Sequence, residues 1–201
     1  MMQYSEACER NKIPILNILE DAFAGRNDVL EIGGGTGQHA VFLAGRLRHL
    51  RWQSTDRPEA LPALSERVRQ EGPENCDEPV ALDVDVRPWP AAIVERSFDS
   101  VYTANTLHIM SWKSVENLFD AIGPLLANGG TLCVYGPFRY AGRLTTASNE
   151  RFDASLRARD PLSGIRDFDA VNELAARQGL QLVADHAMPA NNQLLVWSRA
   201  G

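Results

Sequence analysis

Apolar and polar positions alternate along this chain in two periods, which predict strands and helices in turn. Short apolar runs typical of buried strands are followed by longer runs with apolar residues three and four positions apart, typical of amphipathic helices. The predicted strands are DVLEI (28–32), RWQST (51–55), EPVALDV (78–84), FDSVYTANTL (98–107, running into a loop) and TLCVYGPF (131–138). The predicted helices between them are GQHAVFLAGRL (37–47), ALPALSERVRQEG (60–72) and SVENLFDAIGPLLANGG (114–130). This order predicts a parallel sheet with helices on both of its faces.

Proline and glycine mark the expected boundaries of two helices. An N-terminal helix is expected to start near Pro14, because proline suits a first turn and disfavours helix at the residue before it. SEACERNK (5–12) is therefore expected to precede that helix as a separate segment. The helix over 114–130 is expected to be interrupted at Gly123 and Pro124 and to stop at the Gly-Gly pair 129–130.

A helix over 167–179 and two strands, over 180–188 and 193–199, close the chain. The connection PANN between the two strands is too short for a crossover, so they are expected to form an antiparallel pair at one edge of the sheet. The chain (1–201) is therefore predicted to be a single α/β domain. Its Rossmann-like sheet is expected to have seven mostly parallel strands and an antiparallel C-terminal edge strand.

A glycine-rich turn, GGGTG (33–37), follows the first sheet strand and opens the next helix. In open α/β sheets ligands bind at the carboxyl ends of the strands, which is where this turn falls. The dinucleotide fingerprint G-x-G-x-x-G fits only as Gly35, Gly37 and Ala40, a late start for a turn that leaves the strand after Glu31. A mononucleotide P-loop needs a lysine after its last glycine, and this turn has none. A glycine-rich turn without a ligand is the remaining alternative.

One frame fits the turn directly: Glu31, Gly33, Gly35 and Gly37, in the order acidic-x-G-x-G-x-G. This frame resembles the first motif of class I S-adenosylmethionine-dependent methyltransferases. The resemblance implies that the glycines let the backbone approach the methionine part and the ribose of a ligand without phosphate. It also implies that the carboxylate is a counterpart for the ammonium group of the ligand, directly or through water.

Two aspartates stand at the expected ends of the next two strands. Asp56 lies 19 residues after Gly37, near the spacing at which a carboxylate accepts from the hydroxyl pair of a ribose. We favour this interpretation over a cap for the following helix. Asp83 ends the third strand, where class I methyltransferases often place an acidic residue beside the adenine amino group. A solvated turn at Asp83, or the same role for Asp85, is the alternative.

Later motifs and the flanks extend the resemblance over residues 5 to 199. FDSVYTANTLH and LLANGGTL resemble the fourth-strand motif and the turn before the fifth strand of the class. SEACERNKIPIL, WQSTD, YGPF, SNERFDASLRARDP and MPANN resemble a methyltransferase-like family known as domain of unknown function 938. This resemblance implies a class I fold with S-adenosylmethionine as cofactor. It also favours the N-terminal segment (1–24) as a lid, with Arg10 and Asn11 at the cofactor, over a solvated charge run.

Candidate catalytic residues lie where the fourth and fifth strands end. Methyl transfer from a sulfonium is an in-line displacement, so alignment and desolvation supply much of the rate. A general base is needed only when the nucleophile must lose a proton. The candidates are Asn105, His108 and Tyr135. His108 has the pKa best suited to a base at neutral pH, and its alternative is a hydrogen-bonded histidine that shapes the donor pocket.

The segment 139–164 is interpreted as an acceptor-side insertion, because long loops in compact domains tend to be functional. It is expected to be irregular apart from a helix over 149–160. This segment and its edge carry Arg139, Arg143, Arg157, Arg159 and Arg166. Guanidinium groups suit an anionic small molecule, but pairing with Asp153, Asp160 and Asp167 is the favoured alternative.

Composition and charge narrow the range of partners. The formal net charge is −6 and the pI about 5.2, which makes the protein a poor general binder of nucleic acid. NTLH (105–108) also lacks the prolines and the stacking aromatic of the N-P-P-[YF] tetrad in amino-directed nucleic-acid methyltransferases. Three widely spaced cysteines indicate neither a disulfide framework nor a metal site. No apolar run nears the roughly 20 residues of a membrane span, and no signal region is recognised, so a cytoplasmic location is expected.

These features predict an S-adenosylmethionine-dependent methyltransferase that acts on a small molecule, with no metal, nucleic acid or membrane involved. The oligomeric state stays open. The main alternative is a protein that binds the cofactor but is non-catalytic or depends on a partner. An NAD-linked oxidoreductase is less favoured, because Gln38 stands where a dinucleotide frame starting at Gly33 requires glycine.

Overall fold

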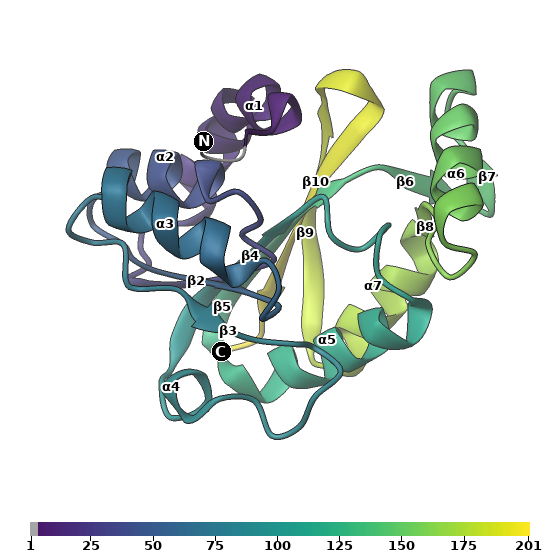
Figure 1. Ribbon diagram of the computed structural model, residues 1–201. Coiled ribbons are helices and arrows are strands. Elements are labelled where there is room, and N and C mark those ends of the chain that lie inside the picture. The colour runs from purple at the N-terminus through teal and green to yellow at the C-terminus, as the bar shows by residue number, and fades with distance from the viewer. Residues whose placement is uncertain (1–3) are drawn as a thin grey trace.

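The computed structural model describes residues 4–201, so the first three residues of the predicted lid segment lie outside it. A seven-stranded sheet forms its centre, in the order β3-β2-β1-β4-β5-β10-β9 (Figure 1). The strands are β1 (Asp28–Ile32), β2 (Arg51–Asp56), β3 (Val80–Ala81), β4 (Phe98–Ala104), β5 (Leu126–Gly136), β9 (Leu180–Met188) and β10 (Asn192–Arg199). Strands β1 to β5 are parallel, and β10 is antiparallel to both β5 and β9. The predicted fold class is confirmed, with the antiparallel strand lying beside the edge strand β9.

Helices cover both faces of this sheet (Figure 1). One face carries α1 (Glu6–Ala22), α2 (Gln38–Arg46) and α3 (Leu61–Glu71), and the other carries α4 (Ala91–Val94), α5 (Trp112–Leu125) and α7 (Phe168–Arg177). Val29 and Tyr102 pack into the core under α1 and α2, whereas Leu30 and Val101 pack into the core under α5 and α7. This division follows from the two-residue period of a strand. No helix within residues 4–201 is long and apolar enough to cross a membrane.

The helix predicted to start near Pro14 instead starts at Glu6, which corrects the expected boundary. Ser5 is its N-cap, and the Ser5 hydroxyl accepts from the Cys8 N–H at 3.4 Å. A proline inside a helix removes one backbone hydrogen bond and costs about 3 kcal/mol. Tertiary contacts on both sides of Pro14 offset this cost: the first half of α1 bonds to α2, and residues such as Ile15 are fully buried.

Helix α5 runs through Gly123 and ends at Leu125, and strand β5 starts at once at Leu126. The expected interruption and the expected stop at 129–130 were therefore wrong. Gly123 is a packing residue, because a Cβ there would lie 2.2 Å from the carboxamide oxygen of Gln178. The Arg199 guanidinium donates to the carbonyls of Gly123 and Leu126, which satisfies carbonyl groups that a helix end leaves unpaired.

The segment expected to be irregular contains ordered elements. Strands β6 (Phe138–Tyr140), β7 (Arg143–Leu144) and β8 (Arg166–Asp167) form a second, three-stranded sheet. The predicted helix is confirmed as α6 (Ala147–Arg159), capped by Thr146. Strands of two or three residues are too short to show a period, which is why the pattern did not predict them. Helices α1 and α6 both stand at the carboxyl ends of the parallel strands (Figure 1).

Candidate cofactor and acceptor site

The glycine-rich turn leaves the carboxyl end of β1 in a conformation that requires glycine. Gly33, Gly35 and Gly37 have φ of 73°, 55° and 76°, in the left-handed region that residues with a Cβ avoid. The Gly33 N–H donates to the Thr55 carbonyl at 3.0 Å. A Cβ at Gly33 would lie 2.5 Å from Thr106 Cγ2, whereas a Cβ at Gly35 would meet nothing within 4 Å. Gly33 is thus packed against the protein, and Gly35 borders open space.

Glu31 lies under this turn with only 2 % of its surface exposed. Its Oε2 accepts from the Ser54 hydroxyl at 2.6 Å and from Trp52 Nε1 at 3.0 Å. Burial raises the pKa of Glu31, and these two hydrogen bonds oppose that shift. Oε1 receives no hydrogen bond from the part of the chain that the structure describes. A buried carboxylate is costly unless it is paired, and a cationic ligand group beside the turn would offset that cost.

Asp56 lies on the turn at the end of β2. Its Oδ2 accepts from the Gly35 N–H at 2.6 Å, and its Oδ1 accepts from the Arg57 N–H at 2.7 Å. The carboxylate therefore lies beside the open space over Gly35. The alternative role as a helix cap is not seen, because Ala60 occupies the N-cap of α3.

Asp83 follows β3 at the same edge of the sheet. Its Oδ1 accepts from the Asp85 N–H at 2.9 Å, which stabilises a turn. The carboxylate of Asp85 is occupied elsewhere, since it accepts from the Ser114 hydroxyl at 2.7 Å and from Asn117 Nδ2 at 2.8 Å. Of the two aspartates, Asp83 is the one not bound to a neighbouring helix.

The first half of α1 is attached to the turn by the side chain of Gln38, the first residue of α2. Gln38 Oε1 accepts from the Ser5 N–H at 2.6 Å and from the Thr36 hydroxyl at 3.0 Å. Gln38 Nε2 donates to Glu9 Oε1 at 2.9 Å. The carboxamide thus connects α1 with the residue between two turn glycines. The sequence pattern gave no indication of this contact, because Ser5 and Gln38 are far apart along the chain.

Asn11 is buried in the same contact, whereas Arg10 is not. Burial lowers the pKa of His39 to about 4, so its ring is neutral and its Nε2–H donates to Asn11 Oδ1 at 2.7 Å. Asn11 also bonds to the Tyr135 side chain. Arg10 is exposed and forms an ion pair with Glu6 at 3.3 Å. The structure therefore brings Asn11, but not Arg10, into the contact between α1 and α2.

His108 is 6 % exposed and forms no side-chain hydrogen bond with any residue from 4 to 201. Its ring makes an edge contact with Phe152 of α6, with centroids 5.3 Å apart. Burial, together with Arg166 and Arg159, lowers the pKa of His108 to about 4. The imidazole is therefore neutral at neutral pH. The alternative of a hydrogen-bonded structural histidine has no partner in the described chain.

Tyr135 and Asn105 meet through the backbone and not through their side chains. Asn105 has φ 58°, and its N–H donates to the Tyr135 carbonyl at 2.9 Å. The Tyr135 side chain is 3 % exposed and packs in the core under α1 and α2. It bonds to Asn11 and Asn192, and burial raises its pKa. The three predicted catalytic side chains therefore do not form one cluster.

The arginines of the insertion are largely engaged by the protein. Arg157 pairs with Asp153 at 2.8 Å, and Arg139 lies 3.9 Å from Asp167. Arg166 is buried and donates to three backbone carbonyls of the segments 107–110 and 162. The favoured alternative of internal pairing is confirmed for Arg157 and Arg139.

Residues that the sequence argument missed are Trp52 and Ser54, which hold Glu31. The signal was present: Trp52, Ser54 and Asp56 alternate along β2 and so share one face, and Ser54 lies directly opposite Glu31. Alternation alone does not say which face meets the turn.

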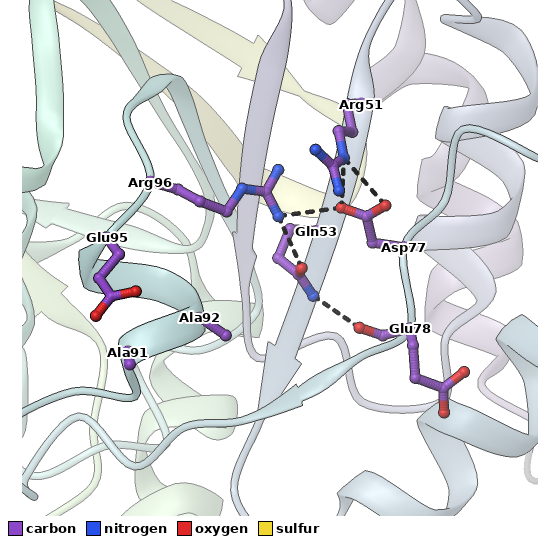
Figure 2. A pocket seen from close by; sticks show the side chains of 8 residues that line it. All are labelled: Arg51, Gln53, Asp77, Glu78, Ala91, Ala92, Glu95 and Arg96. Atoms are coloured by element: carbon purple, nitrogen blue, oxygen red, sulfur yellow. Dashed lines mark hydrogen bonds and ion pairs between the residues drawn. The ribbon is translucent and has the colours of Figure 1, made fainter.

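A surface depression of about 540 Å³ lies at the other end of β2 (Figure 2). Three of its charged side chains pair with one another, since Arg51 and Arg96 both reach Asp77 at 2.8 and 3.0 Å. This depression lies at the end of β2 opposite to the turn, so it is not part of the site at the carboxyl ends of the strands. Among residues 4–201, no group of three His, Cys, Asp or Glu is placed to hold a metal ion.

The fold is shared with solved methyltransferases. An O-methyltransferase family protein from Burkholderia thailandensis has a TM-score of 0.82 at 16% identity, over 98% of this chain and 58% of the other. Human N-acetylserotonin methyltransferase, solved in complex with SAM, has a TM-score of 0.79 at 16% identity, over 98% and 53%. The S-adenosylmethionine-dependent methyltransferase SibL has a TM-score of 0.78 at 24% identity, over 97% and 56%. The chain spans little more than half the length of each.

A family model agrees with the resemblance found in the sequence motifs. The model described as "Protein of unknown function (DUF938)" matches residues 2–199, which is nearly the whole chain. The chain therefore belongs to the DUF938 family, and its fold is the Rossmann-like fold of class I S-adenosylmethionine-dependent methyltransferases.

Proposed function

We propose that this protein is an S-adenosylmethionine-dependent methyltransferase that acts on a small molecule by in-line methyl transfer. One observation carries the proposal: the buried carboxylate of Glu31 lies under a left-handed glycine turn that borders open space at Gly35. The ligand that fits is small enough to lie on bare backbone and carries a cationic group. It needs no phosphate-binding lysine.

The cofactor would be held by residues at the ends of β1, β2 and β3. Glu31 would face its ammonium group, and Asp83 would face its adenine amino group. A carboxylate has about four acceptor positions, and Asp56 uses two of them for N–H groups, which leaves two for a pair of ribose hydroxyls. When bound, the cofactor supplies a methyl group on a sulfonium that is activated for displacement.

The remaining candidates act on the acceptor side or on the lid. His108 is neutral, so it accepts a hydrogen bond from the reacting group of an acceptor and orients it. With a pKa of about 4 it is a weak base, and alignment supplies most of the rate in this proposal. Tyr135 is a positioning residue, because it connects Asn11 of α1 with β10. The 1–24 segment would act as the lid and 139–164 as the acceptor side.

The competing proposal is a protein that binds the cofactor without catalysing transfer on its own. The observation that favours it is the absence, among the three catalytic candidates, of a group that titrates near neutral pH. Transfer of labelled methyl from S-adenosylmethionine to a panel of hydroxyl, amine and thiol compounds separates the two. Turnover supports the enzyme, and cofactor binding with no turnover on the panel supports the binding protein.

Calorimetry with S-adenosylmethionine, S-adenosylhomocysteine and NAD tests the cofactor assignment. Asp56→Ala should weaken binding of the first two by about 1–3 kcal/mol, because it removes partly buried hydrogen bonds. Glu59→Ala is the matched control, since Glu59 is exposed and near in the chain. Tight binding of NAD with no response to either sulfur ligand would refute the proposal.

A further inference from the structure

Two polar side chains without partners stand at the carboxyl end of β5. Gln193 Oε1 is buried and accepts no hydrogen bond in the described chain. The His108 imidazole, 6 % exposed, also makes none with residues 4–201. Leaving a buried acceptor such as Gln193 Oε1 unpaired costs about 1–3 kcal/mol, so this oxygen, with the unbonded His108 ring on the same face, indicates a place where a ligand supplies the missing partner.

Gly136 brings these two groups together. Gln193 lies directly opposite Gly136 in the β5–β10 pair, and opposite residues share a face with Cβ positions roughly 4.5–5.5 Å apart. A Cβ at Gly136 would lie 3.6 Å from His108 Nδ1. The neighbouring pair Tyr135 and Leu194 faces the other core, under α1 and α2. The absence of a side chain at Gly136 therefore lets the His108 ring lie against the backbone on the face that carries Gln193.

This place adjoins the proposed cofactor turn on one side and apolar side chains on the other. Thr106, two residues before His108, packs against Gly33 of the turn. Phe152 contacts the His108 ring, and Ile109, next in the chain, is 57 % exposed.

The chemistry of the pair selects the ligand. A neutral imidazole has one acceptor nitrogen and one N–H donor, whereas Gln193 presents a buried acceptor oxygen without a partner, so it is Gln193 that calls for an O–H or N–H donor. A carboxylate has no hydrogen to offer and would face the Gln193 oxygen with its own lone pairs. Arg166, whose charge lowers the pKa of His108, is committed to backbone carbonyls, so it does not offset that repulsion.

We propose that Gly136, His108 and Gln193 form the acceptor-binding site, and that the acceptor is an uncharged small molecule with a hydroxyl or amine on an apolar body. The hydroxyl or amine donates to Gln193 Oε1 and also hydrogen-bonds with the His108 imidazole, and the apolar body packs on Phe152. Gln193 is thus a specificity-determining residue. The assignment of this ligand as the methyl acceptor rests on the proposed function, whereas the existence of the binding site is tested by binding alone.

The test uses the full chain with labelled histidine rings, whose four signals are assigned by substitution, and two probes of similar size, phenol and benzoate. Phenol should shift the His108 ring signals in a saturable way, and benzoate should bind at least tenfold more weakly. Gln193→Leu and Gly136→Ala should each weaken phenol binding about tenfold or more, as expected for a lost hydrogen bond of about 1.4 kcal/mol or a filled space. Gly136→Ala should fold, since its Cβ makes an ordinary contact. Gln181→Leu, on the exposed edge strand, is the control.

The results of these binding experiments decide separately on the acceptor site and on the proposed function. Unmoved His108 signals with phenol, benzoate binding as tight as phenol, or an unchanged phenol affinity in Gln193→Leu would each overturn the acceptor site. Parallel calorimetry with S-adenosylhomocysteine tests the proposed function separately. Phenol binding without cofactor binding would remove the methyltransferase proposal and leave the site, and cofactor binding without phenol binding would do the reverse.

Discussion

Replacing Gly33 by alanine should destabilise the protein more than the same change two residues later. At Gly33 the new Cβ would take a left-handed backbone, with φ 73°, and would lie 2.5 Å from Thr106 Cγ2. At Gly35 the backbone is also left-handed, with φ 55°, but nothing lies within 4 Å. The two variants therefore share the backbone cost and differ in the steric one.

The magnitudes follow from these two terms. A left-handed residue with a Cβ costs roughly 1–2 kcal/mol, and overpacking a core costs about 1–3 kcal/mol. Gly33→Ala should therefore lower the free energy of unfolding by about 2–5 kcal/mol, and Gly35→Ala by about 1–2 kcal/mol. In Gly35→Ala the loss of binding free energy for S-adenosylmethionine should exceed the loss of free energy of unfolding, because the new Cβ enters the space that we assign to the cofactor.

A second substitution isolates the steric term. Thr106→Ser removes Cγ2 and keeps the hydroxyl, which lies 2.6 Å from the Thr103 hydroxyl; on its own it should cost about 0.8 kcal/mol for the lost methyl. In the Gly33→Ala background it should restore about 1–3 kcal/mol. Urea unfolding of the four proteins gives the coupling energy directly. Equal losses at Gly33 and Gly35, or no coupling with Thr106, would show that this packing argument is wrong.

Three further predictions concern titration and the lid. Burial raises the pKa of Glu31, so this carboxyl group stays protonated to higher pH in the folded protein than in the unfolded chain. The free energy of unfolding therefore falls as the pH rises from the unfolded to the folded pKa of Glu31. With rising pH, the Glu31→Gln variant should therefore become more stable relative to the native chain, and it should bind S-adenosylmethionine more weakly. Urea unfolding at several pH values that shows no such difference in stability would contradict a raised pKa at Glu31. The pKa of His108 is lowered from 6.5 to about 4, so the free energy of unfolding is unaffected by this group above pH 6.5 and falls as the pH drops toward 4. A ring titration by NMR with a midpoint near 6.5 would contradict this. Asn11→Leu removes the hydrogen bonds to His39 and Tyr135, so it should destabilise the protein by about 1–3 kcal/mol and speed amide exchange in α1. The control Arg10→Ala changes an exposed residue and should alter stability by no more than about 0.5 kcal/mol. Equal effects of the two variants would contradict a role for Asn11 in holding α1.

Features that depend on neighbours in the chain could be predicted from the sequence. The two-residue period of β1 and β4, the helical period of α2, and the Glu31–Gly33–Gly35–Gly37 spacing each lie within one short segment. The position of the glycine turn could also be predicted, because parallel strands joined by helices place their carboxyl ends at one edge. Asp56 and Asp83 could be predicted to lie at strand ends for the same reason, and their contacts with a cofactor stay a prediction.

What the sequence by itself determined was therefore the set of local elements, the fold class they build and the turn that we assign to the cofactor. Only the tertiary structure decided that α1 continues through Pro14, that Gly123 makes room for Gln178, and that Gly136 brings His108 and Gln193 to one face. Each of these depends on contacts between residues far apart in the chain, where the energy of a buried contact or a strand register outweighs a local preference of a few kcal/mol.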